Sequence, residues 1–384
     1  MVFLSFGWTA QRVARKRIRN FSGTSRFLTS SPGLNDKRGT AVVIGGTGYV
    51  GSHVVKQLLS KNYRVRATSR DAKKAAWIKN ILSPTSAQNE ANKGTGENES
   101  DVEIFELSLS NTTPTDAKMD SLLNGTDAVF FCAGFERQDP STIDFMVNNA
   151  QATIQAAKRQ KVSCVVLTSS GGSTNPSDHP NEVPKKEHEH WSDPESQKQR
   201  GRFSPAAKTL MEIHALAAVG RNQANQIVQP EKAKDAPRLC IMNPNLILGP
   251  QLHPGPISGN SLPWIVRILK GEAMNETIPN DSMSIIDVRD LALLHVACFE
   301  NEDASGRYFG VDKSYPWEEI LTVFEDALPS YEKPPRFEGV QHTPTQFDFT
   351  RRDSLGVKLR PLKETMGDLI AFLQSKGVLI GERS

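Results

Sequence analysis

Long hydrophobic runs and closely spaced cysteines are both missing from this sequence. A membrane-spanning helix needs roughly 18 or more consecutive apolar residues, and no run in the 384-residue chain approaches that length, so no membrane span is expected. The chain has four cysteines, none in a CxxC or Cys/His metal-ligand spacing: Cys132, Cys164, Cys240 and Cys298. Because they lie in or beside apolar segments, we expect reduced and mostly buried thiols. The HEH stretch at 188–190 lies in a charged loop, where no metal site is expected.

Acidic residues are absent from the first 35 positions, which hold six basic residues and many serines and threonines. This composition resembles a mitochondrial presequence, and the RNFS stretch at 19–22 predicts cleavage after Phe21. A plastid signal and a tail that targets nothing, in a cytosolic protein, are the alternatives. Loss of residues 1–21 would leave 41 basic against 43 acidic residues. That balance gives no reason to expect nucleic acid as a partner.

Short apolar runs alternate with helix-like stretches from residue 40 onward. Buried strands separated by helices predict an α/β fold, a Rossmann-type doubly wound parallel sheet with a smaller C-terminal substrate lobe. The expected strands cover 41–46, 63–70, 128–134, 163–170 and 239–250, and the clearest expected helices cover 50–62 and 145–160.

Polar segments and a change of pattern predict the domain limits. Residues 1–36 are expected to be a targeting or disordered segment, and 37–240 the dinucleotide-binding domain. Residues 241–384 are expected to form mainly the substrate lobe, with strands that return to the main sheet. Within the first domain, 83–100 reads as a disordered insertion and 171–200 as a long loop over the active site.

A glycine-rich turn joins the first expected strand to its helix, with Gly45, Gly48 and Gly51 spaced as GxxGxxG. In such a turn the first glycine permits the tight bend, the second lets a pyrophosphate approach the backbone, and the third lets helix and strand pack closely. The helix start offers amides to the phosphates. The turn therefore predicts a dinucleotide site that includes Gly45, Thr47, Gly48, Tyr49, Val50 and Gly51.

The end of the second strand, ATSRDAKK, predicts which dinucleotide is bound. A protein that prefers NAD usually has an acidic residue there for the ribose hydroxyls, whereas Arg70 takes that place here, with Lys74 following. A guanidinium can pair with the 2′-phosphate of NADP, which a carboxylate would repel. We therefore expect NADP as the cofactor.

Several stretches occur together and in a family's order over roughly residues 40–380. They include GGTGYVGSHVVKQLLSKNYRVRATSRD, VVLTSSGGS, KTLMEIHAL, NPNLILGP and IIDVRDLALLHVACFE. Together they resemble the extended short-chain dehydrogenases/reductases of the epimerase/dehydratase superfamily, and most closely the dihydroflavonol reductase and cinnamoyl-CoA reductase branch. The resemblance implies an NADP-dependent oxidoreductase whose partner is a small-molecule carbonyl compound: a ketone, an aldehyde or a thioester.

The resemblance also implies roles for single residues. Ser170 matches the serine that hydrogen-bonds the substrate oxygen, with Ser169 as the fallback, and Lys208 matches the lysine that holds the nicotinamide ribose. Asp287 and Asp290 are expected to cap a helix and form salt bridges. Further cofactor contacts are implied at Ser108, Leu109, Cys132, Ala133, Asn243 and Pro244, where Ser108 replaces the family's aspartate.

The tyrosine that this family places four residues before the lysine is absent. Position 204 holds Ser204, and no tyrosine occurs between Tyr63 and Tyr308. The family's phenol donates a proton to the carbonyl oxygen, and the nearby ammonium lowers its pKa. A serine hydroxyl is shorter and far less acidic. Ser204 could instead be a helix N-cap, since Pro205 suits a first turn.

The sequence permits three interpretations of Ser204. The first is a reductase in which another group donates the proton: Ser170, a water held by Ser204 and Lys208, or a histidine among His179, His188 and His190. The second is a non-catalytic NADPH-binding subunit, structural or sensing, in mitochondria. The third is a different reaction that does not need the phenol. The first is our leading expectation.

Overall fold

The computed structural model describes residues 38–82, 101–110, 116–134 and 139–379. The expected targeting segment 1–36 and the expected insertion 83–100 lie outside the described residues. No helix within those described ranges has both the length and the apolar character to cross a membrane.

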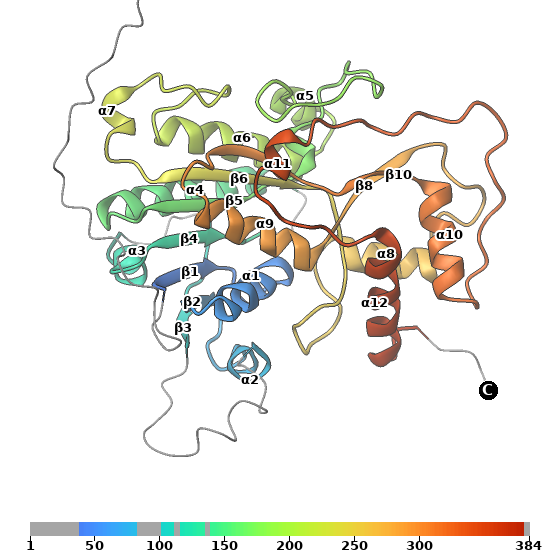
Figure 1. Ribbon diagram of the computed structural model, residues 1–384, viewed down its shortest axis with the longest axis horizontal. Helices are drawn as coiled ribbons and strands as arrows, with labels where there is room; N and C mark the ends of the chain where they lie inside the picture. The colour runs from blue at the N-terminus through green and yellow to red at the C-terminus, as the bar shows by residue number, and fades with distance from the viewer. Residues whose placement is uncertain (1–37, 83–100, 111–115, 135–138, 380–384) are drawn as a thin grey trace, which may run out of the picture. The chain divides into compact units, whose positions relative to one another are not determined.

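Seven strands of the described residues form one parallel sheet in the order β3-β2-β1-β4-β5-β6-β9 (Figure 1). Strands β2 and β3 are added on one side of β1, and β4, β5 and β6 on its other side. Doubly wound sheets bind ligands where the side changes, here between β1 and β4, at the carboxyl ends of the strands. The strands are β1 (Thr40–Ile44), β2 (Arg64–Ser69), β3 (Val102–Glu106), β4 (Ala128–Phe131), β5 (Cys164–Thr168), β6 (Arg238–Pro244) and β9 (Gly306–Gly310).

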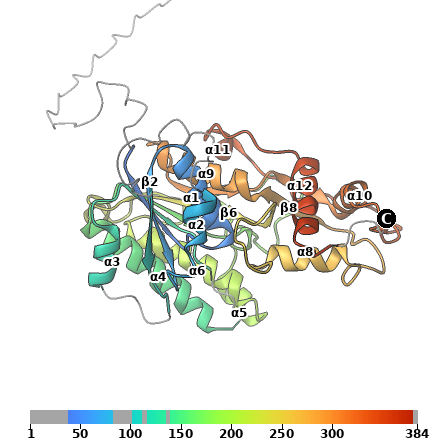
Figure 2. The same cartoon turned by 90° about the horizontal axis from the view of Figure 1, so that it is seen from below.

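Helices cover both faces of this sheet (Figure 2). One face packs on α1 (Tyr49–Ser60), α2 (Trp77–Leu82) and α9 (Val288–Glu300), and the other on α3 (Asp116–Leu123), α4 (Ser141–Arg159) and α6 (Phe203–Ala218). Neighbouring residues of β1 point to opposite faces, since Val43 joins the core under α1 and Val42 the core under α4. This two-sided burial explains why the strands read as continuous apolar runs.

The C-terminal part builds a smaller lobe around a three-stranded sheet in the order β10-β8-β7 (Figure 1). Its strands are β7 (Leu246–Leu248), β8 (Ser282–Asp287) and β10 (Lys313–Pro316). Its helices are α8 (Ser261–Leu269), α10 (Trp317–Ala327) and α12 (Leu362–Ser375). The short helix α11 (Thr350–Asp353) instead packs beside β9 of the main sheet. Strand β6 crosses residue 240, which is the expected limit between the two domains. Strand β9 follows the lobe strands β7 and β8 in the chain and pairs with β6 in the main sheet.

These observations confirm the predicted fold class. Two segments differ from the secondary structure that the sequence predicts. The stretch 171–200 is not entirely loop, because it contains the short helices η1 (Gly171–Ser173) and α5 (Pro194–Gln199). The expected strand 239–250 is two strands, β6 and β7, which belong to different sheets. A further short helix, α7 (Pro230–Ala233), precedes β6.

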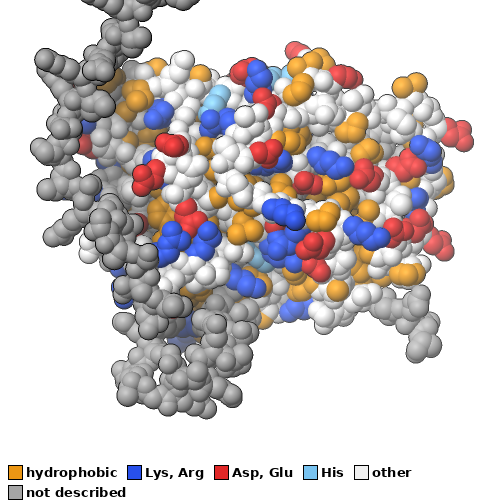
Figure 3. Space-filling model, viewed as in Figure 1, with side chains coloured by type: hydrophobic (Ala, Val, Ile, Leu, Met, Phe, Trp, Pro, Cys, Tyr) orange, Lys and Arg blue, Asp and Glu red, His pale blue; other side chains and the backbone are white. Residues whose placement is uncertain are grey.

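Side chains of both charges are interspersed over the face of the molecule in Figure 3.

The four cysteines are free; Cys132 is partly buried and the other three are buried, as the sequence predicted.

Candidate functional site

The glycine turn between β1 and α1 has the geometry of a phosphate-binding turn. Gly45 has φ of 81°, a conformation that L side chains rarely adopt. A Cβ on Gly51 would lie 2.1 Å from the carbonyl oxygen of Gly45, so only glycine allows this close packing. Gly48 is the N-cap of α1 and supplies no side-chain cap, which leaves the first amides of the helix, from Tyr49 onward, for an anion.

The side chain of Tyr49 is directed away from this turn. Its hydroxyl donates to the carbonyl of Gly249 at 2.9 Å, and its ring packs edge-on against His53. Burial raises its pKa well above the usual value, with the Asp287 carboxylate adding to the shift. Thr47 and Val50 are partly buried beside it. A cofactor contact at Tyr49 would therefore use its backbone.

The predicted adenosine contacts follow the next strands of the sheet. Arg70 follows the carboxyl end of β2 and is exposed. Lys74 is exposed and pairs weakly with Asp71 at 3.8 Å, and the Asp71 carboxylate also accepts from the backbone amides of Lys73 and Lys74. Beyond β3, Ser108 is exposed, while Leu109 packs partly against the core under α4.

Lys208 lies where the carboxyl ends of β4 and β5 meet α6. Its Nζ donates to the carbonyl oxygen of Thr168 at 2.8 Å. Burial lowers the pKa of Lys208 to about 8, opposed by the carboxylate of Glu212. The thiol of Cys132 hydrogen-bonds Thr168, and its burial raises the pKa to about 11. Ala133 follows at the end of β4, partly buried. The structure thus brings Lys208 and the end of β4 together, as the resemblance implied.

The two serines that follow β5 have different surroundings. Ser169 is buried and donates to the Glu212 carboxylate. Ser170 is partly exposed, and its Oγ accepts from the backbone amide of Gly172 at 3.1 Å, which caps η1. Ser170 is therefore the serine with access to a ligand, and Ser169 is part of the protein interior.

Glu212, one turn after Lys208 on α6, organises the interior behind this site. Its carboxylate pairs with the guanidinium of Arg307 at 2.8 Å, and both side chains are fully buried. Arg307 also donates to the carbonyl oxygen of Ser173 at 2.8 Å and stacks on Trp191 at 3.7 Å. These contacts fasten the 171–200 segment to β9. Glu212 was not predicted from the sequence, although its spacing of four from Lys208 on one helix was a usable signal.

The side chain of Asn243 is hydrogen-bonded within the protein. Its Nδ2 has two protons to share among three acceptors: the Glu212 carboxylate at 2.7 Å, the hydroxyl of Ser173 at 2.9 Å and the carbonyl of Ser170 at 3.2 Å. Asn243 thus holds the backbone of Ser170 in place. Pro244 ends β6 and is buried.

Ser204 lies within the first turn of α6, one turn before Lys208. The N-cap of α6 is Arg202, so the alternative that Ser204 is the N-cap is wrong. Neither Ser204 nor any other residue supplies the missing phenol, because every tyrosine of the chain lies in a different setting. Their positions are α1 for Tyr49, the residue before β2 for Tyr63, β9 for Tyr308, β10 for Tyr315 and the segment after α10 for Tyr331. The two aspartates named above behave as expected: Asp287 caps α9 and pairs with Arg289, and Asp290 pairs with Arg360.

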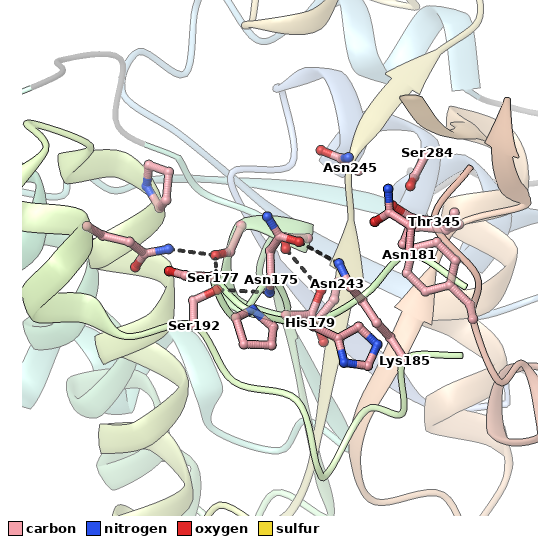
Figure 4. A pocket seen from close by; sticks show the side chains of 18 of the residues that line it. Asn175, Ser177, His179, Asn181, Lys185, Ser192, Asn243, Asn245, Ser284 and Thr345 are labelled. Atoms are coloured by element: carbon pink, nitrogen blue, oxygen red, sulfur yellow. Dashed lines mark hydrogen bonds between the residues drawn. The ribbon is translucent and has the colours of Figure 1, made fainter. Parts of the chain in front are cut away.

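A cavity of about 730 Å³ opens beside these residues (Figure 4). Gly171 and Gly172, directly after Ser170, line it, as does Pro205, directly after Ser204. Of the three histidines proposed as proton donors, only His179 lines this cavity. His188 instead approaches Gly306 at the start of β9, and burial lowers its pKa to about 4. Among the described residues, no cluster of His, Cys, Asp and Glu is placed to hold a metal ion.

Comparison with known proteins agrees with this geometry. A family model described as NAD(P)H-binding matches residues 45–201. Cinnamoyl-CoA reductase 1 of Oryza sativa subsp. japonica is 28% identical over 353 residues, which cover 90% of this chain and 93% of the rice protein.

Solved structures show the same fold. Vestitone reductase from alfalfa superposes with a TM-score of 0.69 at 20% identity, covering 89% of this chain and all of the alfalfa chain. The yeast methylglyoxal/isovaleraldehyde reductase complexed with NADPH also superposes with a TM-score of 0.69 at 20% identity, covering 88% of this chain and all of the yeast chain. The predicted nicotinamide dinucleotide cofactor is confirmed. The chain contains an NAD(P)H-binding domain, and its relatives include the cinnamoyl-CoA and dihydroflavonol reductases, which are extended short-chain dehydrogenases/reductases.

Proposed function

We propose that the protein is an NADPH-dependent reductase of a small carbonyl compound that works without the family's tyrosine. The observation that carries the proposal is the position of Lys208. This lysine is held at the carboxyl ends of β4 and β5, one turn from Ser204. Gly171 and Gly172, directly after Ser170, line a cavity large enough for a small substrate.

The residues present fit a dinucleotide. The uncapped start of α1 and the exposed Gly48, which has no side chain, leave room for a pyrophosphate at the backbone. The exposed guanidinium of Arg70 suits a 2′-phosphate. When bound, NADPH supplies the hydride that reduces the carbonyl carbon. Lys208 would hold the ribose hydroxyls with its ammonium, whose pKa burial lowers to about 8.

The protein groups then have two tasks at the substrate oxygen. Ser170 has a partly exposed hydroxyl whose oxygen already accepts from Gly172, so its proton can be donated to a substrate carbonyl. A proton must also reach the oxygen as it gains charge, and three sources fit: Ser170 itself, a water between Ser204 and Lys208, or His179 in the cavity wall. Loss of one general acid lowers a rate by about 10²–10⁴-fold, so a slow reductase is expected.

The test is oxidation of NADPH by the purified full chain with a panel of ketones, aldehydes and thioesters, followed by absorbance. We expect slow turnover of at least one compound that Lys208→Met abolishes. Ser204 itself favours a second candidate, a non-catalytic NADPH-binding subunit, structural or sensing, in mitochondria. That candidate predicts NADPH binding, seen by fluorescence, with no oxidation by any member of the panel.

A further inference from the structure

The cavity beside Ser170 has a lining of mainly polar side chains. Amides and hydroxyls reach it from the 171–200 segment, from the end of β6 and from the lobe (Figure 4). Pockets for small apolar ligands are lined mostly by hydrophobic and aromatic groups with a few polar ones. The reverse proportion here suits a ligand that is itself polar. Polar side chains that Figure 4 labels in this lining are Asn175, Ser177, His179, Asn181, Lys185, Ser192, Asn243, Asn245, Ser284 and Thr345.

Lys185 is the buried charge in this lining. The residue is 4% exposed, and its Nζ donates to the side-chain oxygen of Asn175, which lines the same cavity. An ammonium has three donors, and the hydrogen bond to Asn175 uses one of them. The ion pairs between described residues do not include Lys185. Burial lowers its pKa to about 8, so at neutral pH it remains mostly charged.

The backbone around Lys185 fixes this charge in position. Its amide donates to the carbonyl of Gln346 at 2.9 Å, and its carbonyl accepts from the amide of Asp348 at 2.8 Å. These two bonds make a parallel bridge between Lys185 and Phe347, which ties the 171–200 segment to the chain before α11. The backbone of Lys185 is therefore held in place without a ligand, and the hydrogen bond to Asn175 positions the ammonium, which reduces the entropy lost when a ligand binds.

The carboxylates of the cavity do not neutralise Lys185. Asp178, Asp193 and Asp281 line the cavity, and all three are exposed. Asp193 accepts from the backbone amides at the start of α5, and Asp281 accepts from the next backbone amide. Two further lining cations are exposed: Arg200 and Arg202. A buried cation without an anion is unfavourable, and a ligand that brings an anion would remove that cost.

We propose that the cavity binds a small carbonyl compound that carries an anionic group, a carboxylate or a phosphate, and that this group pairs with the ammonium of Lys185. The carbonyl half of the statement rests on the proposed function. The anion half rests only on the cavity and on the burial of Lys185.

Measuring the binding of anions tests the predicted anion site at Lys185 without any turnover. The full chain, saturated with NADPH, is titrated at pH 7 with glutarate and separately with inorganic phosphate, and the heat of binding is recorded. The matched variants are Lys185→Met and Lys186→Met, because Lys186 is the next residue, exposed, and paired with Glu189 at 3.1 Å. We expect wild type and Lys186→Met to bind at least one anion. Lys185→Met should bind it about 10–100-fold more weakly, as loss of a hydrogen bond to a charged group implies.

Two results would overturn the anion site: no binding of either anion to the wild type, or equal binding by Lys185→Met. NADPH binding serves as the check that each variant is folded, and Lys185→Gln is a second neutral variant if Lys185→Met fails it. Which of the two anions binds decides between a carboxylate and a phosphate.

Turnover then separates this proposal from the proposed function. Short oxo acids are compared with their methyl esters as oxidants of NADPH. We expect the acids to have at least tenfold higher kcat/KM in the wild type and in Lys186→Met, and this preference to disappear in Lys185→Met. Anion binding without any turnover would leave the anion site standing and contradict the reductase. Equal turnover of acids and esters, unchanged in Lys185→Met, would leave the reductase standing and contradict the anion site.

Discussion

Arg307 of β9 and Glu212 of α6 form an ion pair of 2.8 Å in which neither side chain has any exposed surface. The pair joins the strand that returns from the lobe to the helix that carries Lys208. Because Glu212 also accepts from Ser169 and Asn243, the pair fixes the backbone on which Ser170 is placed. Breaking a buried pair leaves an uncompensated charge, which costs far more than losing a surface pair.

Arg307→Met should therefore lower the free energy of unfolding by about 3–5 kcal/mol. Arg307→Met combined with Glu212→Gln should recover part of this loss, since no charge is then left buried. The control is Arg336→Met, which removes a surface pair with Glu318 (66% and 33% exposed) and should cost under about 1 kcal/mol. Urea unfolding measures all three. A loss for Arg307→Met as small as the control's would contradict the structural role of the pair.

Arg70→Asp should move the cofactor preference from NADPH toward NADH. Replacing a guanidinium by a carboxylate removes a partner of the 2′-phosphate and adds repulsion, so the ratio of the two dissociation constants should change at least about 10–100-fold. Arg64→Asp is the matched control, because Arg64 is also exposed but begins β2 at its opposite end. Fluorescence titration gives both constants, and an unchanged ratio in Arg70→Asp would remove the 2′-phosphate role.

Ser204→Tyr should place a phenol one turn before Lys208, where the nearby ammonium favours its ionised form. With a carbonyl that the natural protein reduces, we expect turnover to rise by at least about tenfold, within the range of general acid catalysis. Ser204→Phe adds the ring without the hydroxyl and should give no rise. Equal loss of turnover in both variants would mean that neighbouring side chains fill the space that the ring needs.

His295 should make the protein less stable in acid. It is fully buried, its Nε2 accepts from the hydroxyl of Thr168 at 2.7 Å, and its Nδ1 donates to the carbonyl of Leu291 at 2.7 Å. Burial lowers its pKa from 6.5 to about 4. The unfolded chain therefore binds a proton that the folded chain does not between these two values, so stability falls as pH falls from 6.5 to 4.

At the acid end of that range, the buried His295 lowers the free energy of unfolding by up to about 3 kcal/mol. His295→Gln should flatten this part of the stability profile, measured by urea unfolding at several pH values. His214→Gln, at an exposed position of α6, should leave the profile unchanged. If the two variants give the same profile, the buried histidine is not the source of the acid sensitivity.

The expected mitochondrial location rests on residues 1–36 and is tested apart from the fold. A fusion of this segment to a fluorescent reporter should enter mitochondria, because its basic, acid-free composition suits import. Sequencing of the mature amino terminus should find Ser22 first. Cytosolic retention, or entry into plastids, would support one of the two alternatives.

The sequence by itself determined the cofactor turn, the alternation of strands and helices, and the absence of a tyrosine before Lys208. These features are local: the spacing of Gly45 and Gly51 fixes the turn between two neighbouring elements, and four residues on one helix fix the distance from Ser204 to Lys208. Only the tertiary structure decided that Asn243 hydrogen-bonds Glu212, that Arg307 pairs with Glu212 and that Lys185 is a buried charge beside a cavity. Those properties arise where segments far apart in the chain meet at the carboxyl edge of the sheet, and burial depends on all the segments that meet there.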